Sequence, residues 1–323
     1  MEVVDAPLKG GRAAAAARPL RAQEPFHAEL PLLCVATDVR HEALLCRQCL
    51  APLGRPADHV RAVAPELLES DELRPLADVS EARELCVAAA GSCARCDARF
   101  CGECVARDAQ AAHVCAGVGA VRDRWPKLGS APRFRLFVKA LGLVTSAGEG
   151  AAAAAAAIET LCRPALPSDG NTLAVAAFEA ELAEPLAQLH CALARERLAR
   201  AAADLATETA LETSAAIARM ATWCTPTGYR NFERRVATNA HGLRFTSPAG
   251  SVLAAAIAAS PTLSAAAQET VLWAVAGVGD ECELPFYCAT ALFATASALN
   301  HSCRPSCVPS ATFQLLVLYI APD

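Results

Sequence analysis

The sequence predicts an α+β fold, with short strands near both ends of the chain, a cysteine-rich metal-binding segment and a largely helical middle region. Three observations support this prediction. The 16 cysteines include three C-x-x-C pairs between residues 46 and 104. Hydrophobic residues make up 54% of the 323 residues and aromatic residues only 5%, with many alanines, which suits helices that pack through small side chains. Apolar runs typical of strands occur at residues 31–35 and 313–320.

In the first half of the chain, turn residues and helical spacing predict the secondary-structure elements. Pro and Gly punctuate residues 1 to about 45, which predicts turns and short strands. A polar, acidic insert at about residues 56–84 interrupts the cysteine-rich segment and predicts two or more helical turns. A helix that ends near Gly142 is predicted after Trp125, because apolar residues recur there at helical spacing: Phe134, Phe137, Val138 and Leu141.

The second half alternates long helices with short strands. The low-complexity segment 148–157 favours helix by composition, or is a tolerated insert. Residues 178–223 predict one or two long amphipathic helices, with Pro185 near the first start. Their apolar stripe consists of Leu182, Leu186, Leu189, Leu193 and Leu198. A strand at 243–245, a helical segment at 253–275 and a strand at 313–320 follow.

Charge and hydropathy exclude several classes of function. The net charge of −5 gives no overall attraction to nucleic acid or to an anionic membrane. Residues 1–5 lack the basic and apolar regions of a secretory leader. The most apolar stretch, 252–279, is broken by Ser260-Pro261, Gln268 and Glu269 and does not predict a membrane span. We therefore expect a soluble protein of the cytoplasm, the nucleus or both.

The cysteine-rich segment predicts two zinc ions. Its four ligand pairs are Cys46 and Cys49, Cys93 and Cys96, Cys101 and Cys104, and His113 and Cys115. Zinc takes four Cys or His ligands, and a C-x-x-C turn supplies two of them. In a cross-braced arrangement, the first and third pairs share one ion and the second and fourth pairs the other. Buried structural thiols are the alternative, and Cys86 is an alternative ligand in the fourth pair.

The stretch from Cys93 to Cys115 resembles a MYND-type zinc finger. It departs from the family pattern in three spacings. The first two pairs are 43 residues apart, the third pair has two intervening residues instead of three, and the fourth pair has one instead of three. Because the cost of closing a loop grows slowly with its length, the cross-brace is expected to survive the long insert.

A second motif lies near the end of the chain. Asn300-His301-Ser302-Cys303-Arg304-Pro305-Ser306, preceded by the segment 292–299, resembles the N-H-S-C-x-P-N signature of SET-domain methyltransferases. Residues 9–24, with Gly11 and Arg12, are similar to the opening turn of the same family, and Ala13 stands where that family has a second Gly. The segment 239–243 resembles its Asn-containing segment. These resemblances imply an S-adenosylmethionine site formed by Gly11, Arg12, Ala13, Asn239, Leu299, Asn300 and His301.

Together the two motifs resemble the SET-and-MYND (SMYD-type) protein-lysine methyltransferases. The resemblance divides the chain into an N-terminal part of the SET domain at 1–45, a zinc finger with a long insert at 46–115, a helical SET-insert region at 116–280 and a core SET segment at 281–323. It implies methyl transfer to a protein lysine. The alternative is a non-catalytic zinc-binding interaction scaffold that keeps the same fold.

The resemblance assigns no catalytic residue to this chain. It implies a catalytic Tyr in a G-E-E-x-x-I-S-Y-like segment after the last strand, and the sequence reaches Asp323 before such a segment. Tyr319 lies in an apolar run and is expected to be a strand side chain. We therefore expect the 323 residues to bind S-adenosylmethionine weakly or undetectably and to transfer no methyl group.

A protein is the expected partner. The resemblance implies a lysine-bearing protein substrate and a proline-rich peptide at the zinc finger. A basic stretch follows the finger, at Arg122, Arg124, Lys127, Arg133, Arg135 and Lys139. We interpret it as a solvated helix face, with an acidic partner or a nucleic-acid backbone as the alternative. No membrane partner is expected.

The purified chain is predicted to contain about two zinc ions per molecule. Cys96→Ser removes a predicted ligand, so it is expected to lose one ion and to unfold the finger more than Cys34→Ser, which lies outside the pairs. Elemental analysis under reducing, metal-replete conditions measures this. A zinc content near zero would contradict the prediction.

Overall fold

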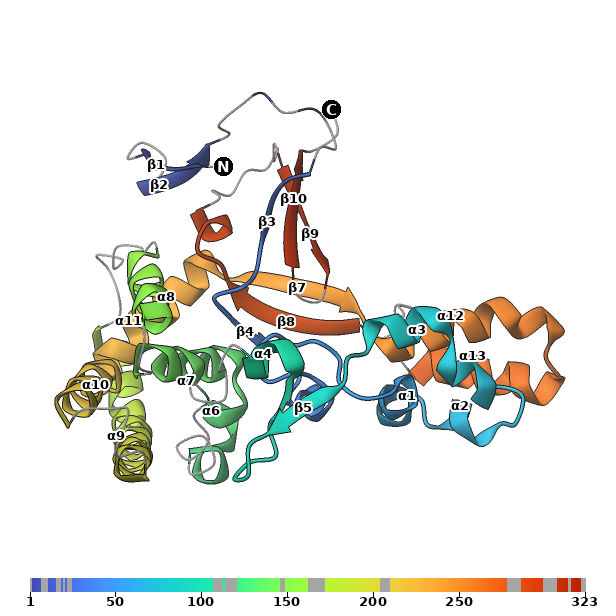
Figure 1. The fold of residues 1–323 in the computed structure, drawn as a ribbon, viewed down its shortest axis with the longest axis horizontal. Helices are drawn as coiled ribbons and strands as arrows, with labels where there is room; N and C mark the ends of the chain where they lie inside the picture. The colour runs from blue at the N-terminus through green and yellow to red at the C-terminus, as the bar shows by residue number, and fades with distance from the viewer. Residues whose placement is uncertain are drawn as a thin grey trace.

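The computed structural model of the chain describes residues 2–6, 11–15, 19, 21, 25–106, 113, 121–145, 149–161, 172–203, 210–277, 286–298, 307–312 and 315–320. The predicted α+β class is confirmed. Short strands form small antiparallel sheets, and helices gather in two groups at opposite ends of the molecule (Figure 1). The cysteine-rich segment lies between these two groups (Figure 1).

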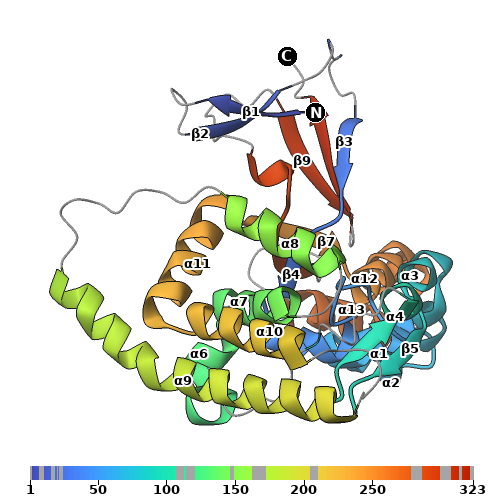
Figure 2. The same cartoon turned by 60° about the vertical axis from the view of Figure 1, so that its left-hand side comes forward.

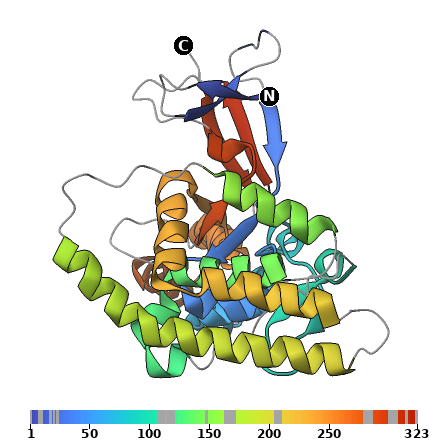
Figure 3. The ribbon, with the colours of Figure 1, turned by 90° about the vertical axis from the view of Figure 1, so that its left-hand side faces the viewer.

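Two three-stranded sheets join the ends of the chain. β4 (Leu33–Ala36), β8 (Phe286–Leu292) and β7 (His241–Thr246) form one sheet with β8 in the centre. β3 (Pro25–Glu29), β10 (Leu315–Ile320) and β9 (Cys307–Thr312) form the other, with β10 in the centre. Tyr319 lies in β10, as predicted, and pairs with Val308. The second sheet projects away from helix α9 in all three views (Figures 1, 2 and 3).

A further hairpin lies at the N-terminus. β1 (Glu2–Ala6) and β2 (Gly11–Ala15) pair with each other, with Val4 opposite Ala13. Neither strand joins the two larger sheets. β2 contacts η5 (Ala296–Ala298), a 3₁₀ turn that directly follows the central strand β8 and its loop.

The larger helical group surrounds α7 (Pro132–Thr145), which packs on β4. Around it lie α6 (Pro126–Ser130), α8 (Glu149–Thr160), α9 (Thr172–Ala203), α10 (Ala210–Trp223) and α11 (Pro226–Asn239). The Phe137 ring lies 5.0 Å from that of Tyr229 and 5.4 Å from that of Phe232. Aromatic pairs at this spacing add to the gain from burial, so a few rings fix α7 against α11 despite the low aromatic content.

Two details of the predicted helices are wrong. Pro185 lies inside α9, because the helix begins at Thr172 in an Ala-rich segment with no apolar stripe to mark it. Leu198 is 53% exposed, so the buried stripe ends at Leu193. The low-complexity segment forms α8, whose Ile158 is buried in the same core. In the described part of the chain, no helix has both the length and the apolar character needed to cross a bilayer.

The second helical group combines two segments far apart in the sequence. The acidic insert forms α1 (Pro56–Val63), α2 (Glu66–Glu69), η3 (Arg74–Asp78) and α3 (Ser80–Leu85). These elements pack against α12 (Pro248–Ala259), η4 (Ser260–Thr262) and α13 (Ala265–Gly277). Their shared core includes Val60, Leu67, Leu73, Val252, Leu253 and Val271. The insert is therefore part of a packed helical unit.

His59 of α1 ties this unit to the central strand β8. The side chain is 0% exposed. Its Nε2 lies 3.1 Å from the carbonyl oxygen of Leu53, and its Nδ1 hydrogen-bonds with the hydroxyl of Tyr287. Because a carbonyl only accepts, Nε2 donates and Nδ1 accepts from the Tyr287 hydroxyl. Burial lowers the pKa of His59 to about 4.

We predict an acid-sensitive stability that depends on His59. Its folded pKa, about 4, lies below the unfolded value of about 6.5, so the unfolded state binds more protons between these pH values. The stabilisation is present above pH 6.5 and is lost as the pH falls towards 4. From pH 7 to 5 the free energy of unfolding is expected to fall by about 2 kcal/mol through this group, as measured by urea unfolding.

His59→Gln tests the assignment. The variant is expected to be less stable at pH 7 but to lose this part of the pH dependence. His190→Gln, on α9 and outside the unit, is the matched control and is expected to keep the wild-type slope. An unchanged slope in His59→Gln would show that another group is responsible.

Candidate metal centre

The first C-x-x-C pair sits in a tight turn. The Cys46 N–H donates to the carbonyl of Ala51 (2.8 Å), and the Leu50 N–H donates to the carbonyl of Cys46 (2.9 Å). Leu50 has a φ of 65°, in the left-handed region that side chains other than Gly, Asn and Asp rarely adopt. This bend folds the chain back after Cys49, so that both thiols face the same side.

The second pair repeats this turn. The Cys93 N–H donates to the carbonyl of Ala98 (2.8 Å), and the Asp97 N–H donates to the carbonyl of Cys93 (3.0 Å). Asp97 has a φ of 54°. Both turns therefore share the pattern C-x-x-C-x-A, with a left-handed residue after the second Cys. An alanine two residues after the second Cys is therefore a sequence signal for this turn, in addition to the C-x-x-C spacing.

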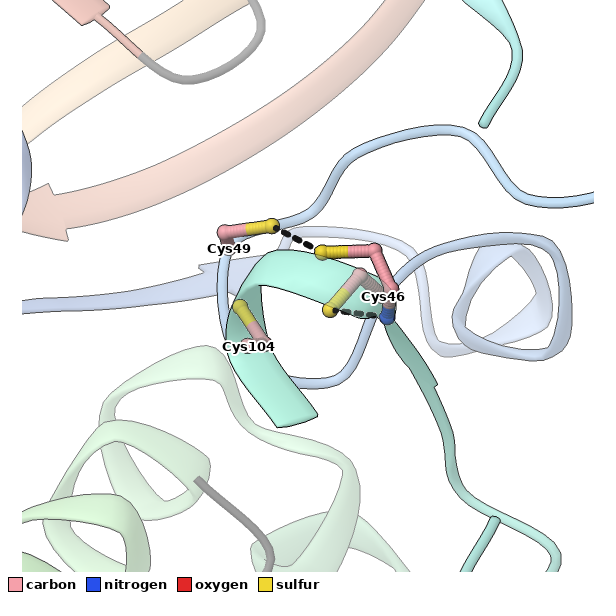
Figure 4. A group of neighbouring side chains, drawn as sticks. Cys46, Cys49 and Cys104 are labelled. Carbon is pink, nitrogen blue, oxygen red and sulfur yellow. Dashed lines mark hydrogen bonds between the residues drawn. The ribbon is translucent and has the colours of Figure 1, made fainter. Parts of the chain in front are cut away.

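The third pair brings two more thiols to the first turn. Cys101 ends β6 (Arg99–Cys101) and Cys104 lies in α4 (Gly102–Ala106). The four sulfur atoms of Cys46, Cys49, Cys101 and Cys104 all lie within 4.8 Å of one another. Figure 4 shows Cys46, Cys49 and Cys104 pointing toward a common centre. The first and third pairs thus come together as the sequence predicts.

The distances in this cluster fit zinc. The Sγ atoms of Cys49 and Cys101 are 3.7 Å apart, too far for a disulfide. Tetrahedral zinc with Zn–S bonds of about 2.3 Å separates its sulfur ligands by about 3.8 Å. The Cys101 N–H also donates to the Cys46 Sγ (3.3 Å), a bond that stabilises a thiolate. Among the described residues, these four cysteines could therefore hold a zinc ion.

Hydrogen bonds connect the thiols of the first cluster. Hydrogen bonds from the thiols of Cys104 and Cys49 hold the pKa of Cys46 well below its usual range. The hydrogen bond to the Cys46 sulfur raises the pKa of Cys104 to about 12. These opposite shifts make Cys46 the more acidic of these two thiols. A bound zinc ion would replace the remaining thiol protons, because its ligand is the thiolate.

The second cluster contains Cys93, Cys96 and His113. The Cys96 Sγ lies 3.1 Å from Nε2 of His113, whose ring packs edge-on against Phe100 with centroids 5.5 Å apart. The predicted fourth ligand, Cys115, lies outside the described residues. Cys86, the alternative ligand, is half-buried and belongs to neither cluster found in the described residues. These three ligands could also hold a zinc ion.

The two clusters interleave along the chain. The hairpin of β5 (Ala89–Ser92) and β6 links the second turn to the third pair. In the sequence, ligands of the first cluster therefore lie on both sides of Cys93 and Cys96. Each site closes a loop that contains part of the other, which is the cross-brace that the sequence predicts.

The segments assigned to the cofactor meet at η5. Gly11, Arg12 and Ala13 lie in β2, which contacts η5. Asn239 ends α11 and is 2% exposed, and its backbone carbonyl accepts a hydrogen bond from the Ser297 hydroxyl (2.7 Å). Leu299, Asn300 and His301 lie outside the described residues. β2 and the end of α11 thus meet at η5, directly before residues 299–301 in the sequence.

Sequence reasoning did not identify Glu29. The carboxylate of this partly buried residue accepts hydrogen bonds from the N–H groups of Thr295 (2.9 Å) and Ala296 (2.8 Å). It thereby fixes the start of η5. More than 260 residues separate the partners, so no local pattern could reveal the contact.

Two of the six basic residues after the finger do not lie on a solvated face. Arg135 is 3% exposed and donates to the carbonyls of Ala36 (2.5 Å) and Thr37 (3.0 Å), and its guanidinium also pairs with Glu42. Lys139 is partly buried and turns toward the first zinc turn. The interpretation of this stretch as a solvated face is wrong at both positions. Arg135 donates to carbonyls at the end of β4, and Lys139 donates to the carbonyls of Cys34 within β4 and of Gln48 in the first C-x-x-C turn.

Comparison with known proteins finds no family model and no curated protein that matches this chain.

Asp97 is predicted to control the second cluster through its backbone conformation. Asp tolerates a φ of 54°, whereas a β-branched residue pays an additional 1–2 kcal/mol, roughly. Asp97→Val is therefore expected to weaken zinc binding at the second cluster about tenfold or more. Asp97→Gly is expected to bind as tightly as the wild type. Competition with a chromogenic chelator measures this.

Asp71→Val is the control, since Asp71 is also exposed and is not among the left-handed residues. It is expected to leave both zinc ions unaffected. Wild-type zinc affinity in Asp97→Val would show that the left-handed turn is not what holds the ligands.

Proposed function

We propose that this chain carries a SET-and-MYND type of architecture and functions in protein-lysine methylation, with S-adenosylmethionine bound where β2, η5 and the end of α11 meet. One observation carries the proposal. β2 and Asn239 both contact η5, although they lie far apart in the sequence. The SET resemblance requires this meeting, because it assigns cofactor contacts to Gly11, Asn239 and Asn300.

The metal centre supports the same proposal. The interleaved clusters match the cross-brace implied by the MYND resemblance. In the sequence, the two clusters lie between β4 and β7, the strands that pair with opposite edges of β8. The finger is therefore an insertion between two strands of one sheet. Four Cys ligands leave zinc no open position for substrate. The role of the first site is therefore structural.

In the proposed reaction, bound S-adenosylmethionine supplies a methyl group for transfer to a neutral lysine amine. The residues of this chain act by holding the segment before Asn300. The Glu29 carboxylate fixes its backbone at Thr295 and Ala296. The Ser297 hydroxyl accepts from the Phe293 N–H (3.1 Å) and donates to the Asn239 carbonyl. A site held from both sides keeps its alignment, which is the main contribution of a protein to such a transfer.

The alternative is a zinc-dependent interaction scaffold without catalysis. Ala13 favours it, because the Cβ stands where the family has a Gly that lets backbone approach the cofactor. Both candidates share the same zinc finger and differ in whether they bind S-adenosylmethionine.

Saturation-transfer NMR with S-adenosylmethionine distinguishes them, because it detects millimolar affinities. We expect weak binding by the wild-type chain and at least a tenfold loss in Asn300→Ala. Asn231→Ala, on the same helix as Asn239, is the control and is expected to bind like the wild type. Binding by the wild-type chain that Asn300→Ala leaves unchanged would contradict the proposal. No signal from the zinc-loaded wild-type chain at millimolar cofactor would favour the scaffold.

A further inference from the structure

Lys139 places a positive charge beside the first zinc turn. It lies in α7, and its Nζ donates to the carbonyls of Cys34 (2.5 Å) and Gln48 (3.0 Å). Gln48 lies between the ligands Cys46 and Cys49. The ammonium therefore sits against the backbone of the turn that carries two zinc ligands.

This ammonium has no carboxylate partner in the part of the chain that the structure describes. Glu42 lines the same small cavity, but its carboxylate is engaged by Arg47 and Arg135. The cavity that Lys139 shares with Cys46 has a volume of about 10 Å³, at most enough for one water molecule. A partly buried ammonium in such a place requires an anion or strong acceptors nearby.

A loaded first site supplies that anion. A Zn²⁺ ion with four singly charged thiolate ligands carries a net charge of about −2. In the weakly screened interior such a charge attracts a neighbouring cation more strongly than at the surface. We propose that Lys139 is the counter-charge of this four-thiolate zinc site and thereby couples zinc binding to the docking of α7.

The coupling follows from the position of α7. Phe134, Phe137 and Leu141 of this helix lie in the main core of the larger helical group. Lys139 reaches from the same helix to the zinc turn and to β4. Zinc in the first site therefore strengthens the contact between the finger and the helical group. This inference depends on zinc at the first cluster and is independent of S-adenosylmethionine.

Substitution of Lys139 separates charge from packing. Lys139→Gln removes the charge but keeps an amide donor for the carbonyls, and Lys139→Arg keeps the charge. Arg133→Met, at an exposed position of the same helix, is the control. The zinc-loaded full chain is titrated with a chelator, and cobalt(II) spectra of the substituted protein distinguish the four-sulfur site from the one with a histidine.

We expect Lys139→Gln to weaken metal binding at the four-sulfur site by about tenfold or more, with no change at the other site. Its acid-induced metal release is expected at higher pH, because thiolates without a neighbouring cation are protonated more easily. Lys139→Arg and Arg133→Met are expected to resemble the wild type. The proposal would be overturned if Lys139→Gln kept the wild-type metal affinity and the wild-type pH of metal release, even with a lowered melting temperature. That result would show that Lys139 contributes packing and not charge.

Discussion

The interleaving of two metal clusters is the constraint on which the rest of this fold depends. The apolar cluster around the ligands contains few residues besides the cysteines, chiefly Ala51, Leu53 and Phe100. So small a core cannot offset the entropy of ordering the segment. Metal binding can supply that free energy, because the site forms only in the folded chain. The left-handed turn at Leu50 is a strained conformation that such a site can hold.

The finger in turn connects the two helical groups. Its acidic insert packs against α12 and α13 at one end of the molecule, and His59 of the insert bonds to Tyr287 of β8. At the other end, both C-x-x-C turns meet the larger helical group. Lys139 of α7 bonds to the first turn, and Glu196 of α9 pairs with Arg95 of the second turn (3.5 Å). Loss of metal would therefore weaken contacts in both directions.

Local patterns in the sequence predicted the local structure, and long-range contacts were beyond them. The C-x-x-C spacing sufficed for the turns and for the pairing of ligands, since cross-bracing is a property of chain order. Helical spacing located α7. The charges of Arg135 and Lys139 led to a wrong prediction of a solvated helix face, because a buried cation and an exposed one cannot be distinguished by sequence alone. The packing of residues 56–85 on 248–277, and the bonds from Glu29 to Thr295 and Ala296, depend on contacts that no periodicity encodes. At the proposed cofactor site, the SET resemblance predicted that β2 and Asn239 lie near one segment. Local secondary-structure propensity alone indicated no site there.

X-ray absorption at the zinc K-edge tests the central claim most directly, because it reports the ligands of both ions in the intact chain. The four-cysteine cluster and the cluster with His113 predict a dominant sulfur shell at about 2.3 Å with a minor nitrogen shell at about 2.0 Å. Such a spectrum would confirm that the cysteine pairs hold the metal. A spectrum dominated by oxygen or nitrogen ligands, without the sulfur shell, would contradict the account.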